Sequence, residues 1–363
     1  MFRQEDAVLD QERSLTDGMN ATANPIASYL DRAGLRGPLM KYWYLYVGSF
    51  YLVWLVLAFG LGDWVHALTH WRMAVVMVLG SVVAGSTPMG GGTVAFPVLV
   101  LLFHESASIG RNFAMAIQAL GMTSAMIFIL CRRTPIQFRM LVGASAGAAV
   151  GLLFGTFTIA PHLSPSVVKL LFASVWVNFG IMTLHKNKEI CALDRVPRMR
   201  KVSDTAIAVL AGLLGGIINS IIGVGIEMVL YTILVLRYRC DLKAAVPTAV
   251  SMGAIASLMG IGLHALIGDI GIEVYYNWLA CGPIVVFGAP FGAFLVSVIP
   301  RLRTLYFVSA LCLLQFAWTL SQVAPQTGEW IFVALSLLGA NAGFHGLYRL
   351  GLTRPADLPE AGN

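Results

Sequence analysis

The chain has 363 residues, of which 58% are hydrophobic and only 12% are charged, and it carries a net charge of +6. Soluble domains contain about 25% charged residues, so this composition, together with several apolar runs of membrane length, excludes a soluble protein and indicates a polytopic membrane protein. The basic residues fall in short loops between the predicted spans, so the positive charge does not indicate nucleic-acid binding.

The chain begins with a polar stretch followed by an apolar one. The first 39 residues mix acids and bases without the apolar core of a signal peptide, so we expect residues 1–39 to form a cytoplasmic N-terminal tail. Residues 40–62 are predicted to be the first transmembrane helix. Within them, Tyr42–Leu61 is apolar and begins with the Tyr and Trp residues that are typical of a membrane interface.

The next apolar run, from Met73 to Phe103, contains no charged residue but is interrupted by Pro88 and three consecutive glycines. Proline removes a backbone donor, and each glycine costs roughly 1 kcal/mol of helix propensity. Irregular backbone at membrane depth is tolerated only where protein or a water-filled cavity satisfies its polar groups. The sequence therefore predicts two half-helices, Met73–Gly85 and Thr93–Phe103, that meet at a break inside the bilayer.

The remaining spans form two halves of similar design. In the first half, residues 72–184, the broken segment is followed by three predicted spans, which are Asn112–Cys131, Met140–Pro161 and Ser164–Leu184. A basic linker, residues 185–203, is predicted to be cytoplasmic and leads to the second half, residues 204–323. There a second broken segment is followed by three more spans, and these elements are Thr205–Leu236, Ala244–Ile267, Tyr276–Val298 and Leu302–Val323.

A last helix, residues 329–348, and a C-terminal tail, residues 349–363, complete the chain. The prediction is thus eight full spans and two broken hairpins.

The distribution of basic residues predicts the orientation of the spans. Most of the 24 Lys and Arg residues fall in four connections, whereas the intervening connections carry only Arg72, Arg111 and Lys169 beside several acids. The positive-inside rule places the four basic connections in the cytoplasm. This arrangement is consistent only if each broken segment returns the chain to the side from which it entered, which makes both termini cytoplasmic.

The two halves align weakly in register. Gly90 and Gly92 correspond to Gly223 and Gly225, and after a one-residue gap Arg111 corresponds to Lys243. Each half comprises a hairpin and three spans, and because three crossings is an odd number, the second copy must be inverted. The predicted fold is an all-α polytopic membrane protein with an inverted-topology repeat of a broken-helix hairpin plus three spans, and with extra flanking helices.

The second of the three full spans in each half carries small residues at four-residue spacing. They are Gly143, Gly147, Gly151 and Gly155 in the first half and Gly288 and Gly292 in the second. We interpret the first set as a close helix-packing surface of the kind common in membranes.

Each break is expected to present backbone N–H groups that have no partner within a helix, at the positive end of a helix dipole. Glycine leaves these groups uncovered, and such a place favours an anion. The alternative is that the glycines serve only close helix packing. The candidate substrate-binding residues at the breaks are Ser86, Thr87, Gly90, Gly91, Gly92, Thr93, Asn219, Ser220, Gly223 and Gly225.

The spans that follow the hairpins add three further candidates, Gln118, Thr248 and Ser251. Gln118 either lines the site or joins helices by hydrogen bonds. Arg111 and Lys243, at the starts of these spans, either attract anions at the two entrances or anchor the spans at the membrane surface.

Glu227 lies two positions after Gly225, where an ionised carboxylate would oppose anion binding. One interpretation is that Glu227 carries a coupling proton, because desolvation favours the neutral acid. The other, which we favour, is a structural interaction with the N-terminus of its half-helix or with Lys243.

Catalytic and cofactor chemistry are not indicated. The seven histidines are dispersed, and His66 and His70 lack the glutamate of an HExxH site. No GK[ST] sequence follows Gly90–Gly92, so there is no P-loop for ATP. We expect no enzyme activity, no metal and no cofactor. The expected partners are a small anion and the lipid bilayer, without nucleic acid, and a homodimer is one option for the assembly.

Two pairs of stretches carry a family resemblance. They are GSTPMGGGTVAFPVLVLLF (85–103) with IGRNFAMAIQALGM (109–122), and SIIGVGIEMVLYTILVL (220–236) with AAVPTAVSMG (244–253). Together they resemble the sulfite exporter TauE/SafE permease family, roughly over Val75–Tyr348. In the second motif Val224, Ile226 and Glu227 stand where the family has more glycine.

The resemblance implies transport of sulfite, sulfoacetate and related sulfur-containing anions across the cytoplasmic (inner) membrane. We therefore expect a secondary transporter that works by alternating access and holds its anion between the two breaks near the midplane. The alternatives are a passive small-anion channel, a membrane-embedded enzyme or a scaffold subunit.

Overall fold

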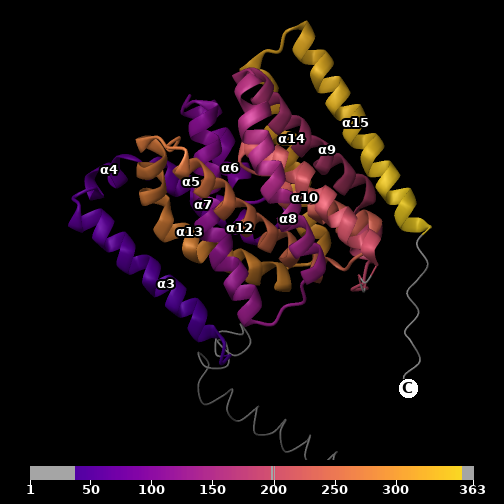
Figure 1. Cartoon of the computed structure of the whole chain (residues 1–363), viewed down its shortest axis with the longest axis horizontal. Helices are drawn as coiled ribbons and strands as arrows, with labels where there is room; N and C mark the ends of the chain where they lie inside the picture. The colour runs from indigo at the N-terminus through magenta and orange to yellow at the C-terminus, as the bar shows by residue number, and fades with distance from the viewer. Residues whose placement is uncertain (1–36, 198, 200, 354–363) are drawn as a thin grey trace, which may run out of the picture.

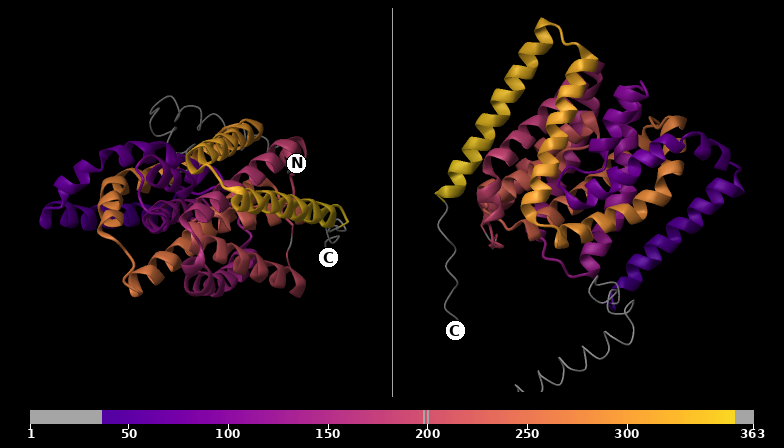
Figure 2. Two further views of the ribbon diagram at one scale, coloured as in Figure 1. Left: turned by 90° about the horizontal axis from the view of Figure 1, so that it is seen from above. Right: turned by 180° about the vertical axis from the view of Figure 1, so that it is seen from behind.

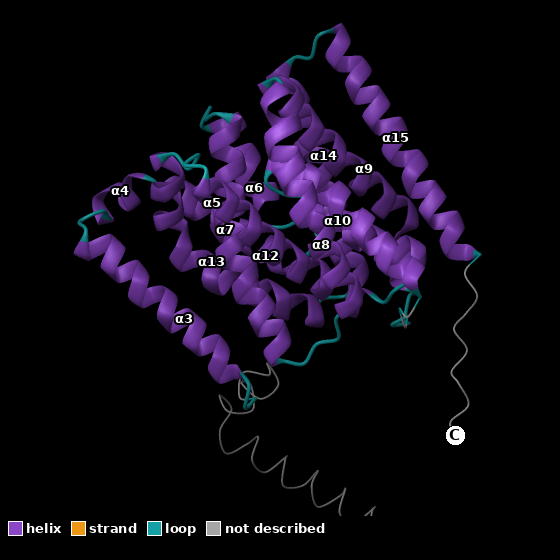
Figure 3. Ribbon diagram, in the orientation of Figure 1, coloured by secondary structure: helices purple, strands orange, loops and turns teal. Residues whose placement is uncertain are grey.

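The computed structural model describes residues 37–197, 199 and 201–353, and this part of the chain is helical apart from turns and one isolated bridge between Arg195 and Cys240 (Figures 1 and 3). Nine of the described helices are long and apolar enough to cross a membrane. The prediction of an all-helical protein with many spans is confirmed. Most of the two predicted tails lies outside the described residues.

The first helix, α3 (Met40–Leu55), continues into a π-helical turn, η1 (Val56–Gly60), and a short helix, α4 (Trp64–Thr69), follows. Helix α3 lies at one edge of the molecule and buries only a narrow strip against α7 and α13 (Figure 1). Polar atoms of its aromatic side chains attach it to these helices. The four hydrogen bonds run from Trp43 to Ser124, Tyr46 to Leu120, Tyr51 to Pro283 and Trp54 to Leu279.

The first broken segment consists of a long arm and a short arm. The long arm is α5 (Trp71–Ser86), and residues 87–91 form the break. The short arm is α6 (Gly92–Pro97) followed by the π-helical turn η2 (Val98–Leu102). The predicted break is thus found at the Pro-Met-Gly-Gly sequence.

Three long helices complete the first half: α7 (Ala107–Cys131), α8 (Phe138–Phe154) with the turns η3 (Gly155–Ile159) and η4 (Ala160–His162), and α9 (Pro165–Cys191). Helix α9 continues through the first seven residues of the predicted linker. The extension is stabilised by an ion pair between Lys186 and Glu189 and by a hydrogen bond from Tyr348 to Glu189.

The second half repeats this order. Helix α10 (Val202–Ile222) leads to a break at residues 223–225, and α11 (Ile226–Thr232) with η5 (Ile233–Arg237) forms the short arm. The long helices that follow are α12 (Leu242–Leu266), α13 (Ile272–Val298) and α14 (Arg301–Val323), and then comes the last helix, α15 (Thr327–Leu352).

Helix α10 differs from the prediction of eight full spans and two broken hairpins. It has 21 residues and is itself long enough to cross a membrane, so it is one of the nine candidate spans. Its sequence contains glycines but no proline before the break, and the glycines at 212, 215 and 216 pack against neighbouring helices instead of ending the helix. The short half-helix expected here is therefore a full-length arm.

Each broken segment begins and ends at the same end of the molecule. In the second half, Tyr238 just after η5 donates a hydrogen bond to Asp204 in the first turn of α10. In the first half, His70 before α5 contacts Glu273 at the start of α13, and Arg111 after η2 contacts Asp269 just before α13. We call the end at which the second broken segment begins and ends the basic end, and the end at which the first one begins and ends the acidic end, after the charges of their loops. The hairpin shape that the loop charges required is thus observed.

Helices α7 and α12 occupy equivalent places and both have 25 residues. Each follows a π-helical turn and one non-glycine residue in the left-handed region, His104 (φ 58°) and Arg239 (φ 54°). Position by position, Arg111 therefore corresponds to Val246. The predicted equivalence of Arg111 with Lys243 is wrong, because the second half has extra residues between its break and α12, whereas the sequence alignment placed its one-residue gap there in the opposite sense.

Helices of the two halves pack on each other in a reciprocal pattern. Helix α10 packs along α8, and α5 packs along α13, while α7 contacts α12 and α9 contacts α14. Figures 1 and 2 show α7 and α12 near the centre of the molecule, with α3 and α15 on opposite flanks.

Glycine allows two of these helix pairs, α8 with α10 and α5 with α13, to approach closely. An added Cβ on Gly147 or Gly151 of α8 would collide with the backbone of α10, and one on Gly292 of α13 would collide with the backbone of α5. In lipid, helices associate through close packing of this kind because no hydrophobic driving force acts between them. The interpretation of the α8 glycines as a packing surface is confirmed.

We expect Gly147→Ala to lower the unfolding free energy of the purified protein by about 1–3 kcal/mol, because the added methyl group forces two backbones apart. The matched control is Gly262→Ala in α12, where an added Cβ meets no atom within 4 Å. This control is expected to leave stability unchanged or to raise it by up to about 1 kcal/mol through helix propensity. Thermal unfolding in detergent measures both, and equal effects would contradict the packing argument.

Candidate functional site

The two breaks touch each other in the interior. Gly90, Gly223 and Gly225 have φ values of 72°, 79° and 116°, in the left-handed region that favours glycine. An added Cβ on Gly92 would collide with Val224, and one on Gly90 would collide with Gln118 and Glu227. The predicted approach of the two glycine clusters is therefore observed.

A buried polar cluster joins the breaks. Gln118 Nε2 donates to Glu227 Oε1 at 3.1 Å, and the backbone N–H of Gly225 donates to Glu227 Oε2 at 3.2 Å. Ser257, which the sequence did not single out, donates to Gln118 Oε1 at 3.3 Å. All of these side chains are buried. Gln118 therefore links helices α7, α11 and α12 at the level of the breaks.

Glu227 thus takes the position that an anion was expected to occupy at the second break. Its contact with the start of its own half-helix, one of the interactions considered for it, is observed. The other, with Lys243, is not, because the Lys243 side chain is exposed at the basic end, where it lines two cavities.

The hydroxyl groups at and beside the breaks are already engaged as donors. Each donates to a backbone carbonyl of the preceding turn, so it offers an incoming group only its lone pairs. These pairs are Ser86 with Val82, Thr87 with Val83, Thr93 with Met89, Ser220 with Ile217, Thr248 with Ala244 and Ser251 with Pro247. Thr248 also accepts the N–H of Gln137, on the side of the basic end.

Two sets of polar groups at the breaks are among those without a partner in the part of the chain that the structure describes. The backbone N–H groups of Gly90 and Gly91 have no hydrogen-bond partner among the described residues. Asn219 is fully buried, and neither its Nδ2 nor its Oδ1 has a partner within the described part of the chain. A buried amide left unpaired costs about 1–3 kcal/mol, so both sets call for a ligand or a second conformation that pairs them.

One cavity reaches the first break from the basic end, and a second extends to Gly85 just before it. One, of about 240 Å³, is lined by Ser86, Pro88 and Lys243 together with Tyr231. The other, of about 340 Å³, is lined by Gly85, Lys243 and two arginines, Arg132 and Arg133. Lys243 and its helical neighbour Val246 border both cavities. In the sequence the two arginines are basic residues of a loop, and nothing in their spacing marks them as cavity residues.

Arg111 has a different environment at the acidic end. Its guanidinium forms an ion pair with Asp269 at 2.8 Å, and His264 Nδ1 lies 3.0 Å from the same carboxylate oxygen. The side chain of Asn112 donates to the Asp269 carbonyl. These contacts join the start of α7 to the loop between α12 and α13, so Arg111 serves here as a link between helices.

The two histidines considered for metal binding make other contacts. His66 stacks on Tyr276 with ring centroids 4.3 Å apart, and His70 Nε2 lies 3.0 Å from Glu273. No group of three His, Cys, Asp or Glu side chains suited to a metal ion is found among the described residues.

Comparison with known proteins identifies one family. The family model described as Sulfite exporter TauE/SafE matches residues 73–319, which include both breaks and exclude α3 and α15. Searches of the curated proteins and of the solved structures gave no match.

We expect Gln118→Leu to lower the unfolding free energy by about 1–3 kcal/mol, because Glu227 loses a donor and Ser257 loses its acceptor in a buried place. The matched control is Gln315→Leu in α14, because Gln315 is also buried but its Nε2 has no partner among the described residues. The control is expected to be neutral or stabilising. Thermal unfolding of the purified variants compares them, and equal losses would show that the Gln118 cluster is not structural.

Proposed function

Because the chain belongs to the sulfite exporter TauE/SafE family, a family of membrane transporters and not of enzymes, we propose that it is a secondary transporter of small sulfur-containing anions such as sulfite or organosulfonates. It would carry them across the cytoplasmic membrane by alternating access. The observation on which the proposal rests is the cavity that contains Lys243 in its lining and reaches the first break at Ser86 and Pro88.

We propose that the two halves are an inverted-topology repeat, related by an axis in the membrane plane. Support comes from the same order of α-helices in α5–α9 and α10–α14, although η3 and η4 have no counterpart after α13, and from the equal lengths of α7 and α12. The exchanged packing of α10 on α8 and of α5 on α13 is the pattern that a two-fold relation produces.

We place the basic end in the cytoplasm, following the positive-inside rule. Contacts near both ends of the described chain support a position of the two termini at the basic end. The carbonyl of Leu39, just before α3, accepts from Cys131 at the basic end, and Arg237, also at the basic end, donates to Leu350 near the end of α15. With this orientation the N- and C-terminal tails are both cytoplasmic.

We place the anion at the first break, where Gly90 and Gly91 present free N–H groups. The second break is the weaker candidate in this conformation, since the Glu227 carboxylate already accepts from Gly225. Lys243, Arg132 and Arg133 would attract the anion from the cytoplasm, because a cleft lined by one sign of charge concentrates ions of the opposite sign.

Asn219 would contact the anion when the acidic end opens. In the alignment of the glycine motifs it corresponds to Ser86, which lines the cavity at the basic end. Asn219 is buried without a partner, as expected of a residue that a ligand contacts only in the other state. In that state Arg111 would have to release Asp269 so that the acidic end could open.

Transport into proteoliposomes tests the proposal. Uptake of sulfite, sulfate, sulfoacetate and taurine is measured with and without a proton gradient. Saturable uptake of at least one sulfur-containing anion is expected. Flux that rises linearly without saturation would indicate a channel, and no flux of any anion would contradict the proposal.

In the same assay we expect Asn219→Leu to lower transport by about tenfold or more, because a hydrogen bond to a charged ligand is worth about 1.5–3 kcal/mol. Its thermal stability should not fall, since the amide has no partner to lose. The control Asn178→Leu should instead lose stability, because Asn178 bonds to Ser174 and Asn341. Loss of stability in Asn219→Leu with unchanged transport per folded molecule would show a structural role.

Glu227→Gln tests the role of the carboxylate. We expect transport to keep its dependence on pH and on the proton gradient, because Glu227 caps a half-helix through Gly225 and pairs with Gln118. Glu105→Gln, in a loop at the acidic end, is the control. If only Glu227→Gln abolishes the effect of the proton gradient, Glu227 carries a coupling proton instead.

A further inference from the structure

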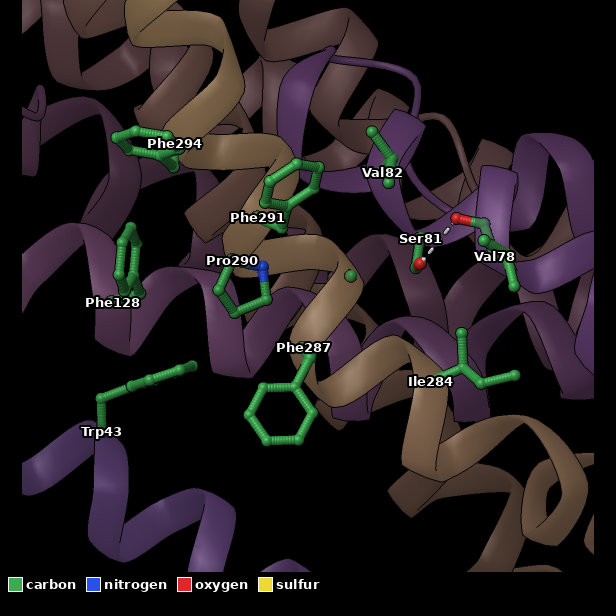
Figure 4. A pocket seen from close by; sticks show the side chains of 11 residues that line it. Trp43, Val78, Ser81, Val82, Phe128, Ile284, Phe287, Pro290, Phe291 and Phe294 are labelled. Atoms are coloured by element: carbon green, nitrogen blue, oxygen red, sulfur yellow. Dashed lines mark hydrogen bonds between the residues drawn. The ribbon is translucent and has the colours of Figure 1, made fainter. Parts of the chain in front are cut away.

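A third cavity, of about 540 Å³, lies between α3 and the rest of the molecule and has almost no polar lining. We call it the aromatic groove. Its walls are formed by Trp43 of α3, Val78 of α5, Phe128 of α7, and Phe287, Phe291 and Phe294 of α13. Figure 4 shows the aromatic rings of α3, α7 and α13 around this space.

The aromatic groove faces the surroundings of the protein. Val78, Phe287 and Phe291 line it and are 55%, 46% and 52% exposed. All three belong to helices in the membrane-spanning part of the chain, so the medium next to them is lipid hydrocarbon. A space with apolar walls in such a place suits an acyl chain, and it does not suit the small anion considered above.

One charged side chain packs on two of the rings that line the aromatic groove. The guanidinium of Arg132, directly after α7, lies 5.5 Å from the ring centroids of both Phe128 and Phe294. Arg132 is half-buried, and it has no ion-pair partner among the described residues. Burial lowers the pKa of its guanidinium, so an anionic partner would stabilise its charge.

We propose that the aromatic groove binds one anionic phospholipid, with an acyl chain along the phenyl rings and the headgroup phosphate at Arg132. Basic pockets between transmembrane helices at the cytoplasmic side are suited to such headgroups. The leaflet follows from the orientation proposed above, whereas the site itself does not depend on the transported substrate. Because Arg132 and Phe128 also line the cavity at Lys243, the lipid lies beside the route proposed for the anion.

Binding of phosphatidylglycerol and phosphatidylcholine with identical acyl chains to the purified full-length protein tests this proposal. Retention of each lipid is measured by native mass spectrometry. The wild type should prefer phosphatidylglycerol about fivefold, the effect of one basic residue next to an anionic lipid. Arg132→Gln should abolish the preference and Arg132→Lys should keep it. Arg349→Gln, an exposed arginine at the end of α15 on the opposite flank, is the control and should keep it.

A second variant tests the acyl-chain part. Val78→Trp places a larger side chain in the aromatic groove from an exposed position, so it should lower the retention of both lipids equally without lowering thermal stability. Equal retention of the two lipids by the wild type, or an unchanged preference in Arg132→Gln, would overturn the proposal. So would a protein dimer in place of bound lipid. No transport is measured here, so failure of the lipid site is distinguishable from failure of the transport proposal.

Discussion

The structure depends on one constraint, that backbone interrupted inside a bilayer must find its partners within the protein. Here each of the two interruptions is covered by the other. Gly90 packs against Glu227 and Gln118, and Gly92 packs against Val224. The only charged member of this contact, Glu227, is held by the Gly225 N–H and by the Gln118 amide. Neither broken segment could keep this conformation alone, so the pairing of the two halves is a condition for folding as well as for any transport.

The same pairing links the supports of the two breaks. Two close helix pairs connect the halves, α8 with α10 and α5 with α13, and in each pair glycine brings the backbones into contact. The long arm of each broken segment is therefore attached to a long helix of the other half. A displacement of one half that separates such a pair at one end must alter the support of both breaks.

The sequence predicted the features that come from local chemistry and missed those that arise from contacts between distant residues. Proline and glycine located the first break and glycine alone located the second, and the loop charges required hairpins, which the hydrogen bond from Tyr238 to Asp204 shows for the second half. The length of α10 was missed because its glycines serve packing rather than termination. The partnership of Gln118 with Glu227 and Ser257 spans more than a hundred residues, and no spacing rule reveals it. The alignment of the glycine motifs also matched Arg111 to Lys243, whereas the helix bounds make Arg111 equivalent to Val246.

The equivalence of Arg111 with the apolar residue Val246 explains why the two ends of the molecule differ. The counterpart of Asp269, judged from the ends of α7 and α12, is Thr134, so the basic end offers no carboxylate where the acidic end has one. Arg111 is consequently paired with Asp269, while Lys243, Arg132 and Arg133 line cavities with no carboxylate among the side chains that border them. Three cations that share a cavity repel one another, and this repulsion opposes closure of the basic end. In the proposed transporter an anion bound near the first break would reduce that repulsion, so the substrate itself would make closure favourable. An empty carrier would then remain open at the basic end, held shut at the other by the Arg111 ion pair.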